Sequence, residues 1–464
     1  MFKLLLLLSI SPTWVSASGN DPLTGVNTST SAVNTTNQSG VLVATQFAGS
    51  DIGAQVNAAY AALPTTGGRI FIPQGTYAWT TPINFSTAGV CPVLEGAGRN
   101  ATTLNWAGSA NATAITFNCS TFSALGGILT GYGLRDLSLF NTVAAGSTVG
   151  ILLGGTNGAF GWYGLNLNTG RFNVNLLYGS NAWNTVCEMC NWDFAGTSNL
   201  VIPSTITNSG EGLTFVGNTF DYSVSTAPLP ACIHNSLGDL LTFLGGSFDN
   251  CQFVQDGGTG NTVLIGVNQE DPVLTSAPGA TAYYGVLSSG SVRIIGGTFL
   301  QDEAIGTPPT QFWNVTGGTL AINGVWASNA NSTKMLLAVA SGTGGILFDV
   351  PAVGGHISYP FWRNNGTGVV QGRDQLGNAV TNGGIAPSLL NQSSGNKYSG
   401  VSACSGGTKS ITFPASYSVQ PSILLFDETT KGGINITAKS TSGFTASCAG
   451  ATDTFDWLVV GNPN

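Results

Sequence analysis

The chain has little charge for its length. Only 7% of its 464 residues are Asp, Glu, Lys or Arg, and 21 acidic residues outnumber 13 basic ones, for a formal net charge of −8. Nucleic-acid binding requires clustered Lys and Arg, so the composition argues against a nucleic-acid partner. The balance also disfavours polyanionic ligands and fits a neutral ligand better, although an acidic balance is common among exported proteins.

Histidine is almost absent, with His234 and His356 the only two. A glycine-rich phosphate loop before a helix, a Gly-x-Ser-x-Gly sequence and a His-Glu-x-x-His sequence are all missing. One Cys-x-x-Cys sequence, Cys187 to Cys190, has no second Cys-x-x-Cys and no nearby histidine to complete a zinc site. We therefore expect no metal and no cofactor.

Long apolar runs are also missing. Lys3 is followed by the short run Leu4–Ile10, and small residues then lead to a cleavage site after Ala17. This pattern predicts a signal peptide. No later stretch approaches the roughly 20 apolar residues of a membrane span. We expect a secreted, soluble protein with no membrane partner.

Glycine, at 65 residues, is abundant, and 42% of the residues are hydrophobic. So many apolar residues argue against disorder, and so little charge favours a β-rich protein that pairs its backbone in long ladders. Eight cysteines fit an oxidising compartment. Spacing alone leaves their connectivity open. The disulfides we expect are Cys91–Cys119, Cys232–Cys251 and Cys404–Cys448.

One stretch, Gly67 to Tyr77, organises the chain. Two glycines form a turn, Ile70 to Ile72 form a short buried strand, and Pro73 ends that strand because it lacks an N–H donor. Before this stretch, apolar residues recur at helical spacing from Asp51 to Leu63. We expect a helix there, capped by Asp51 or the serine before it.

The run from Asp51 to Leu104 resembles the entry to the right-handed parallel β-helix of the pectate-lyase-like superfamily. In that superfamily a short helix caps the open end of the coil stack, and a Gly-Gly-x-φ-x-φ-Pro-x-Gly-x-Tyr turn begins the first coil. The resemblance implies the fold but not one chemistry, because its members include lyases, hydrolases, phage tailspikes and proteins with no demonstrated reaction. The Asn-Thr-Asp, Asp-Asp, Gly-His-Gly and Arg-Ile-Lys segments of polygalacturonases are missing.

From about Gly133 the sequence repeats. Short apolar-Gly-x-x-Phe units recur at a nearly fixed period, which is typical of a solenoid with one coil per repeat. The period is too short for propeller blades, and the leucine-rich consensus is missing. The large apolar residues, 26 to 28 apart within each run, are Phe140, Leu167, Phe194, Phe220 and Phe248, then Phe299 and Trp326.

We therefore predict an all-β protein: a right-handed parallel β-helix with an N-terminal capping helix and a small C-terminal antiparallel β-sandwich. The sandwich follows from five short strands with turn residues between them after residue 400. The predicted layout is a signal peptide at 1–17, a linker at 18–40, the β-helix at 41–375, a linker at 376–400 and the sandwich at 401–464.

Asp221 and Asp249 are the leading catalytic candidates. Each follows an aligned phenylalanine, so they should lie one coil, about 4.8 Å, apart. Carboxyl groups this close separate their proton affinities, which provides an acid and a base or nucleophile. The alternative is that both are turn formers that bond nearby backbone and catalyse nothing.

Further candidates lie on the neighbouring repeats. We expect Glu270 and Asp302 to extend the catalytic set, with Asp193 just before it. Tyr222 and Trp192 are candidate platforms for sugar rings, which stack on exposed aromatic faces. Arg293 is the only basic residue between Arg171 and Lys334 and is a further candidate to contact substrate.

The functional hypothesis is a secreted carbohydrate-active protein, a glycoside hydrolase or polysaccharide lyase, that acts on an extracellular polysaccharide through paired carboxylates on adjacent coils. The alternative is a non-catalytic adhesin or tailspike-like binder of glycans, for which a homotrimer is the expected assembly. A purely structural surface protein is a third reading, because fold alone does not determine function.

Overall fold

The computed structural model describes most of the chain after residue 40. The described residues are 41–120, 131–143, 146–221, 231–238, 240–258, 260–271, 283–301, 310–330, 335–349, 351–355, 357, 362–373, 379–381, 397–404, 407–413, 420–427, 434–450 and 453–460.

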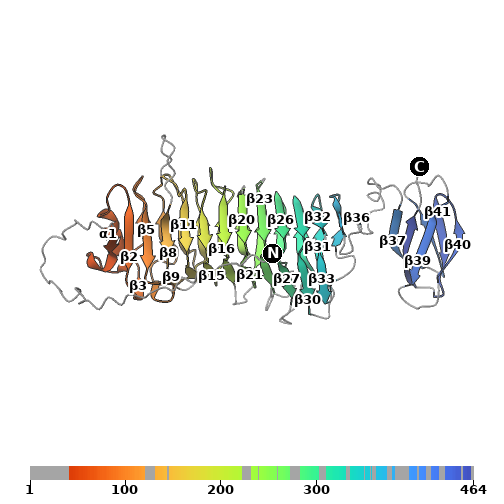
Figure 1. Cartoon of the computed structure of the whole chain (residues 1–464), viewed down its shortest axis with the longest axis horizontal. Coiled ribbons are helices and arrows are strands. Elements are labelled where there is room, and N and C mark those ends of the chain that lie inside the picture. Colours follow the sequence, from red (N-terminus) through yellow and green to blue (C-terminus); the bar gives the residue numbers. More distant parts are fainter. Residues whose placement is uncertain are drawn as a thin grey trace, which may run out of the picture. The chain divides into compact units, whose positions relative to one another are not determined.

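The described residues between 41 and 373 form a right-handed parallel β-helix (Figure 1). The chain passes through three parallel sheets in turn, here named A, B and C, and then returns to the first. Each strand therefore pairs with the strand one coil before it and one coil after it. The predicted all-β solenoid is confirmed, and equivalent residues of consecutive coils lie in register along each sheet.

Sheet A has 14 strands, of which the last, β36, is antiparallel to its neighbour β35. Its strands are β1 (Val41–Val43), β2 (Gly68–Ile72), β5 (Pro92–Gly96), β8 (Tyr132–Arg135), β11 (Trp162–Leu165), β14 (Val186–Glu188), β17 (Leu213–Val216), β20 (Leu240–Leu244), β23 (Asn261–Ile265), β26 (Ser291–Ile295), β29 (Thr319–Asn323), β32 (Gly345–Asp349), β35 (Val370–Arg373) and β36 (Ala379–Thr381).

Sheets B and C have 11 strands each. The strands of sheet B are β3 (Gly75–Trp79), β6 (Thr102–Trp106), β9 (Ser138–Asn141), β12 (Asn168–Gly170), β15 (Asn191–Asp193), β18 (Thr219–Asp221), β21 (Ser247–Asp249), β24 (Asn268–Glu270), β27 (Thr298–Gln301), β30 (Trp326–Asn329) and β33 (Ala352–Gly355). The strands of sheet C are β4 (Ile83–Phe85), β7 (Thr113–Phe117), β10 (Val149–Leu153), β13 (Val174–Tyr178), β16 (Ser198–Ile202), β19 (Ala231–Asn235), β22 (Gln252–Gln255), β25 (Gly285–Leu287), β28 (Gln311–Val315), β31 (Leu336–Ala340) and β34 (Trp362–Asn364).

The corner between sheets A and B explains the repeated glycines. In successive coils it is occupied by Gly217, Gly245, Gly266 and Gly296, with φ between 60° and 65°. Each of these residues donates its N–H to a carbonyl oxygen in the next coil, that of the residue just before the equivalent corner. Because a side chain rarely adopts this left-handed conformation, glycine recurs at the position.

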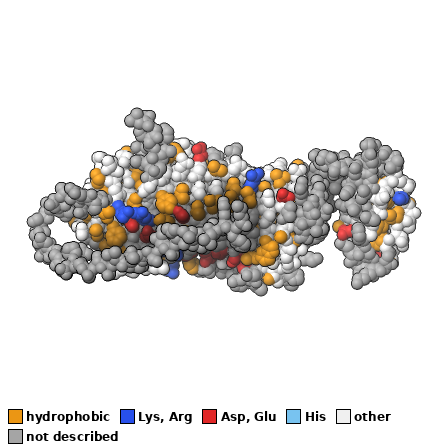
Figure 2. Space-filling model, in the orientation of Figure 1, with side chains coloured by type: hydrophobic (Ala, Val, Ile, Leu, Met, Phe, Trp, Pro, Cys, Tyr) orange, Lys and Arg blue, Asp and Glu red, His pale blue; other side chains and the backbone are white. Residues whose placement is uncertain are grey.

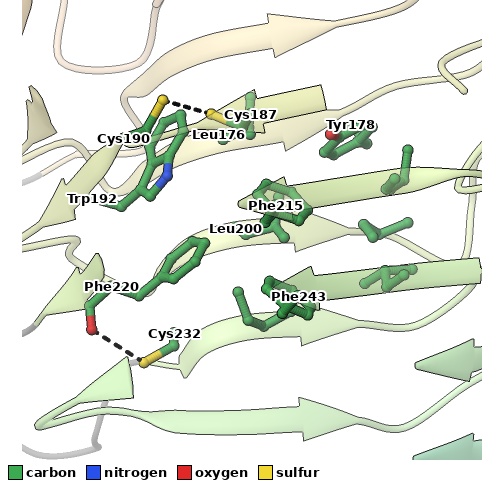
Figure 3. Close-up of a cluster of buried hydrophobic side chains, with 14 of the residues drawn as sticks. Leu176, Tyr178, Cys187, Cys190, Trp192, Leu200, Phe215, Phe220, Cys232 and Phe243 are labelled. Atoms are coloured by element: carbon green, nitrogen blue, oxygen red, sulfur yellow. Dashed lines mark hydrogen bonds between the residues drawn. The ribbon is translucent and has the colours of Figure 1, made fainter. Parts of the chain in front are cut away.

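The interior is filled by ladders of large apolar side chains (Figure 3). Trp192 stacks on Phe220 with ring centroids 6.3 Å apart, and Phe215 stacks on Phe243 at 4.9 Å. Alternate residues of a strand point to opposite faces, so the residues between these ladders face outward. Burial of these rings provides most of the hydrophobic stabilisation of the coils.

The register corrects part of the repeat alignment. Phe220 does pair with Phe248 as predicted. In the coils before them, however, the equivalent residues are Leu139, Thr169 and Trp192, not the three predicted residues Phe140, Leu167 and Phe194. Phe299 likewise pairs with Ala327 and not with Trp326. Coils differ in the lengths of their turns, so a constant period misplaces residues by one or two positions.

Helix α1 (Ile52–Ala61) covers the first coil, where it contacts β2, β3 and β4 (Figure 1). The short 3-10 helix η2 (Ala44–Gln46) precedes it. Asp51 is the N-cap, as predicted, and its Oδ1 accepts the Ala54 N–H at 2.9 Å. Within the described part of the chain, no helix is long and apolar enough to cross a membrane.

Asp51→Ala is expected to destabilise the helix cap by about 2–3 kcal/mol at neutral pH. Although partial burial alone raises the pKa of this carboxyl, N–H donors of Ala54, Thr80 and Thr81 lower it to about 2, from 3.8. The stabilisation is therefore complete above pH 4 and is lost as the pH falls towards 2. Urea denaturation of wild type and Asp51→Ala across this pH range measures the difference in their free energies of unfolding.

Asp51→Asn is the control, since it keeps the hydrogen-bond acceptor but should remove the pH dependence. A difference in free energy of unfolding between wild type and Asp51→Ala that stays constant to pH 2 would contradict the assignment.

The C-terminal strands form two three-stranded antiparallel sheets that share a core. The ring of Phe444 in one sheet lies 5.7 Å from that of Trp457 in the other, as in a small sandwich. β37 begins at Lys397, inside the segment predicted to be a linker. The strands are β37 (Lys397–Ala403), β38 (Thr408–Thr412), β39 (Ser422–Asp427), β40 (Asn435–Lys439), β41 (Gly443–Ser447) and β42 (Thr454–Val460).

The three predicted disulfides, Cys91–Cys119, Cys232–Cys251 and Cys404–Cys448, are present. Cys187 and Cys190 are outside these bonds, and both are buried.

Hydrophobic side chains form a band on the surface of the β-helix (Figure 2). On sheet A, Leu244, Ile265 and Ile295 occupy equivalent outward positions of three successive coils, and each is 36–38% exposed. We name these three residues the aliphatic stripe.

Candidate functional site

Four carboxylates occupy one outward column of sheet B. Asp193 pairs with Asp221, Asp221 with Asp249, and Asp249 with Glu270. Neighbouring strands of a sheet lie about 4.8 Å apart, so each carboxylate has another of the same charge beside it. We name these four residues the acidic ladder. The structure thus brings together the predicted Asp221, Asp249 and Glu270, and it adds Asp193 to them.

Each ladder residue is the last residue of its strand, and its inner neighbour is buried. Trp192, Phe220, Phe248 and Gln269 point into the core, so the carboxylates that follow them point outward. Fully buried rings beneath a half-buried carboxylate reduce its hydration, and this raises the free energy of the charged form.

A second column of hydroxyl and amide side chains runs beside the ladder. Asn191 Nδ2 donates to Asp193 Oδ2 at 2.7 Å, and Ser247 Oγ donates to Asp249 Oδ2 at 2.8 Å. Asn268 Nδ2 likewise donates to Glu270 Oε1. In each pair the donor lies two residues before the acid, which is the spacing that places both on one face of a strand.

Two of the ladder carboxyls hold their protons more tightly than usual. Burial, and then the charge of Asp221, raise the pKa of Asp193 to about 6 against the opposing effect of Arg99. Burial also raises the pKa of Asp249 to about 6, assisted by the charges of Glu270 and Asp221 and opposed by the Ser247 hydrogen bond. Near neutral pH both groups are therefore able to exchange a proton.

Asp249 has a further property expected of a proton donor. Its Oδ1 atom is shielded from solvent and accepts no hydrogen bond from any residue that the structure describes. A buried oxygen without a donor disfavours the ionised form, whereas a protonated carboxyl carries its own O–H. The shielded oxygen therefore favours the protonated form of the Asp249 carboxyl.

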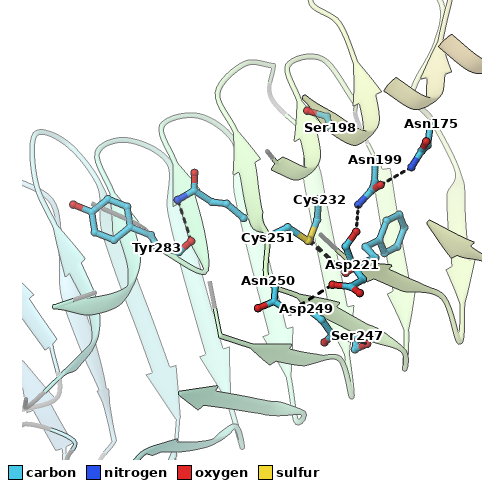
Figure 4. The surroundings of a disulfide bond; sticks show 12 residues. Asn175, Ser198, Asn199, Asp221, Cys232, Ser247, Asp249, Asn250, Cys251 and Tyr283 are labelled. Carbon is cyan, nitrogen blue, oxygen red and sulfur yellow. Dashed lines mark hydrogen bonds between the residues drawn. A yellow bond between two sulfur atoms is a disulfide. The ribbon is translucent and has the colours of Figure 1, made fainter. Parts of the chain in front are cut away.

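Buried asparagines hold the backbone of the ladder from inside, and sequence reasoning missed them. Asn175 Nδ2 donates to the carbonyl oxygen of Asp193 at 2.9 Å. Asn199 Nδ2 donates to the carbonyl oxygen of Asp221 at 3.4 Å (Figure 4). Asn175 also donates to Asn199 Oδ1 at 2.6 Å. The signal available in the sequence is the recurrent Asn-Leu pair, at Asn175-Leu176 and again at Asn199-Leu200.

Asn199→Leu is expected to lower the free energy of unfolding by about 1–3 kcal/mol, because Asn175 and the Asp221 carbonyl each lose a buried partner. Denaturant titration measures the loss. Asn314→Leu is the matched control, since this side chain faces outward on the same sheet and its replacement should change stability by less than about 0.5 kcal/mol. Equal losses in the two variants would show that the buried amide contacts contribute nothing.

The disulfide Cys232–Cys251 lies directly behind the central pair of acids (Figure 4). Its sulfur atoms lie 3.8 and 3.4 Å from the carbonyl oxygen of Phe220. Asn250, between Asp249 and Cys251, has φ of 55° and donates from Nδ2 towards Asp221 Oδ1 at 3.5 Å. The bond thereby ties the turn that follows Asp249 to the strand β19.

Trp192, predicted as a sugar platform, lies in the interior. Its side chain is 0% exposed, and its Nε1 donates to Asn218 Oδ1 at 3.1 Å. Its inward position follows from the strand alternation that turns Asp193 outward. The ring is therefore unavailable to a ligand on the surface, and we withdraw it as a substrate-binding residue.

Arg293 lies on sheet A, away from the column that carries the ladder. It lines a hollow of about 320 Å³ together with Ile295, Ala321, Leu347 and Asp349. The structure therefore does not bring Arg293 together with the acidic ladder. The predicted Tyr222 and Asp302 lie outside the described residues.

A metal centre is not evident in the described ranges, where no three His, Cys, Asp or Glu side chains are grouped as ligands. The ladder carboxylates lie in a line along the sheet, whereas a bound cation requires ligands that converge on one point.

No protein-family model and no curated protein matches the sequence. Among solved structures, the tailspike of Acinetobacter phage vb_AbaP_AS12 superposes with a TM-score of 0.50 at 12% identity, over 90% of this chain and 79% of that chain. The enzymatically active domain of tailspike protein 4 from bacteriophage CBA120 gives 0.44 at 14% identity, over 89% of this chain and 64% of that chain, so this chain spans less than two thirds of its length. The catalytic unit of a GH87 α-1,3-glucanase from Streptomyces thermodiastaticus gives 0.43 at 14% identity, over 71% and 66%.

Identities this low support a shared fold and nothing finer. Three observations indicate the same fold: the three parallel sheets, the capping helix over the first coil and the likeness to a phage tailspike. The chain has the right-handed parallel β-helix architecture of the pectate-lyase-like fold.

Proposed function

We propose that this protein is a glycoside hydrolase that cleaves a polysaccharide lying across sheet B, with Asp249 as the general acid and Asp221 as its carboxylate partner. The observation that carries the proposal is the register pair Asp221–Asp249, in which one member has a pKa raised to about 6 and a shielded oxygen without a donor. Glycosidic cleavage uses two carboxyl groups of this kind, one protonated and one ionised.

The spacing favours a reaction that retains the anomeric configuration. Adjacent coils lie about 4.8 Å apart, near the roughly 5–5.5 Å between the carboxyl groups of retaining enzymes. Asp249 gives its proton to the glycosidic oxygen while Asp221 attacks the anomeric carbon, and the leaving sugar departs. Asp249, now ionised, then takes a proton from water, which attacks the same carbon and releases Asp221.

Asp193 provides an internal alternative. It lies two coils from Asp249, or roughly 10 Å, which is close to the separation in inverting enzymes. Proton NMR of the first product formed distinguishes the pairs. Retention supports Asp221 with Asp249, whereas inversion would assign the base to Asp193.

Hydrolysis fits the site better than elimination. A lyase needs a base that removes a carbon-bound proton, commonly with a cation that neutralises an acidic sugar. The acidic ladder would repel an acidic sugar. Arg293, the basic residue that the sequence predicted to contact substrate, is on another sheet. The hydroxyl and amide side chains beside the ladder suit the hydroxyl groups of a neutral glycan.

A panel of plant and microbial polysaccharides tests the proposal. Reducing-end and unsaturated-product assays are run in parallel on the purified protein. New reducing ends without unsaturated product support hydrolysis. Unsaturated product would overturn it in favour of a lyase, and no product from any glycan that the protein binds would favour a non-catalytic role.

A non-catalytic tailspike-like binder is the second candidate, and the aliphatic stripe favours it. Exposed aliphatic residues on three successive coils are the kind of surface that an assembly covers. Light scattering tests the homotrimer expected for this alternative. Deletion of residues 400–464 separates the two functions, because a binder that recognises glycans through its C-terminal strands loses affinity while a sheet-B enzyme keeps its rate.

Secretion is part of the same proposal. Three disulfides suit an oxidising compartment, and an insoluble or cell-surface polysaccharide is reached only from outside the cell.

A further inference from the structure

The thiols of Cys187 and Cys190 lie very close together in the interior. Their sulfur atoms are 2.7 Å apart and point towards each other above Trp192 (Figure 3). A disulfide bond is about 2.0 Å long, whereas unbonded apolar atoms in contact lie about 4 Å apart. The two sulfur atoms are therefore positioned nearer to a bond than to a packing contact.

These cysteines occupy the two inward positions on either side of the corner between sheets A and B. Cys187 belongs to β14 and pairs with Phe215 of the next coil, and Cys190 immediately precedes β15. In the coil formed by β23 and β24 the same two positions hold Leu264 and Val267, both buried. Apolar side chains suffice to fill this corner, so packing alone does not explain two cysteines here.

The corner between them has an unfavourable backbone. Met189 has φ of 53° and is 63% exposed, so its side chain packs little. Later coils place glycine at this position, as at Gly217 and Gly266. A residue with a long side chain disfavours the left-handed conformation. The Met189 N–H donates to the Val216 carbonyl oxygen at 2.8 Å, and a cross-link between the two flanking cysteines would constrain the corner further.

We propose that Cys187 and Cys190 form a fourth disulfide, which fixes the corner that leads into Asp193. The bond forms by thiol–disulfide exchange with a small-molecule or protein disulfide. One cysteine thiolate attacks that disulfide and releases one thiol, and the second cysteine then displaces the other. The two cysteines are oxidised, the external disulfide is reduced to two thiols, and the two protons pass to those thiols.

The bond closes during folding, before the corner is covered. In the folded coil, burial raises the pKa of the Cys187 thiol well above its ordinary value, which suppresses the reactive thiolate. The same burial, at 1–2% exposure for both residues, shields the completed bond from reductants. Its existence does not depend on the proposed glycosidase activity, because it follows from the two sulfur positions.

Mass spectrometry tests the proposal on the full-length protein folded under oxidising conditions. The protein is denatured without reductant in the presence of iodoacetamide and digested. The peptide that contains Cys187 and Cys190 should be unlabelled and lighter by two hydrogen atoms than its reduced form. Recovery of this peptide with both cysteines alkylated, while the peptides of the other three disulfides stay unlabelled, would overturn the proposal.

Two variants test the effect on the corner. Cys190→Ser should leave Cys187 fully alkylated in the same experiment, since it loses its partner. In the background Cys187→Ala/Cys190→Ala, the further change Met189→Gly should raise the melting temperature more than it does in the wild-type protein, because the cross-link no longer holds the left-handed residue. Equal effects of Met189→Gly in the two backgrounds would show that no bond constrains the corner.

Discussion

Asp249→Asn is expected to lower kcat for polysaccharide cleavage by about 10²–10⁴-fold and to leave the fold intact. The amide has the shape of the acid, and its oxygen still accepts the Ser247 hydrogen bond. It has no proton to give to the leaving oxygen. Reducing-end assays under saturating substrate measure the change, and circular dichroism confirms the fold.

The same substitution should change the pH dependence of stability in a direction that a structural residue would not. Because the pKa of Asp249 rises from 3.8 to about 6 on folding, the folded protein binds this proton more tightly than the unfolded chain. The wild-type protein therefore loses stability as the pH rises from 4 to 6, and the loss remains above pH 6. Asp249→Asn removes this loss, so its melting temperature at pH 7 should exceed that of wild type. Higher stability with lower activity is typical of a catalytic group kept in a destabilising environment.

The pH dependence of activity should also report the protonation of Asp249. A general acid must be protonated, so kcat/KM should fall as the pH rises through about 6. Asp349→Asn, at an outward position of sheet A, is the matched control and should leave both profiles unchanged. The assignment fails if Asp249→Asn retains wild-type turnover, or if it loses activity only in proportion to a loss of folded protein.

The central pair could be predicted from sequence because the coils that carry it are alike. Asp221 and Asp249 follow Gly-Asn-Thr-Phe and Gly-Gly-Ser-Phe, so the corner and the sheet-B strand have the same lengths in both coils. Where those lengths agree, residues at the same distance from the corner glycine lie beside each other on adjacent strands. The positive φ required at the corner accounts for the glycines.

The neighbouring coils could not be aligned in this way. The coil from Phe248 to Gln269 contains fewer residues than the coil from Gln269 to Phe299, although these three residues are in register. A period counted from large apolar residues cannot detect this, because Gln269 occupies an interior position as a polar residue that accepts a hydrogen bond from Trp313. Backbone pairing sets the register. Turns of different length change the number of residues per coil without changing which strand positions pair.

One geometric rule accounts for both the core and the site. In a parallel stack, alternate residues of each strand form continuous columns on the two faces of the sheet. On sheet B the inner column brings Trp192, Phe220 and Phe248 into contact, and the same rise per coil forces Asp193, Asp221 and Asp249 to approach on the outer face. The energy that stacks the rings thus holds like charges together, and their repulsion adds to the effect of burial in raising the pKa of Asp193 and Asp249.

Trp192→Ala tests this coupling and is expected to lower the free energy of unfolding by about 3–5 kcal/mol, the range for truncating a large buried aromatic residue. The change removes a ring that is 0% exposed and stacks on Phe220, and it leaves Asn218 Oδ1 without its donor. Urea denaturation followed by far-UV circular dichroism measures the loss without relying on tryptophan fluorescence.

Trp192→Phe is the control: it keeps a stacked ring and should lose only about 1–3 kcal/mol from the unpaired amide oxygen. If Trp192 were instead a surface platform for a sugar, Trp192→Ala would change stability by less than about 0.5 kcal/mol and would raise the dissociation constant for glycan. The burial of this ring beneath Asp193 predicts the reverse, a large loss of stability, with any loss of glycan binding or cleavage arising only through the displaced strand.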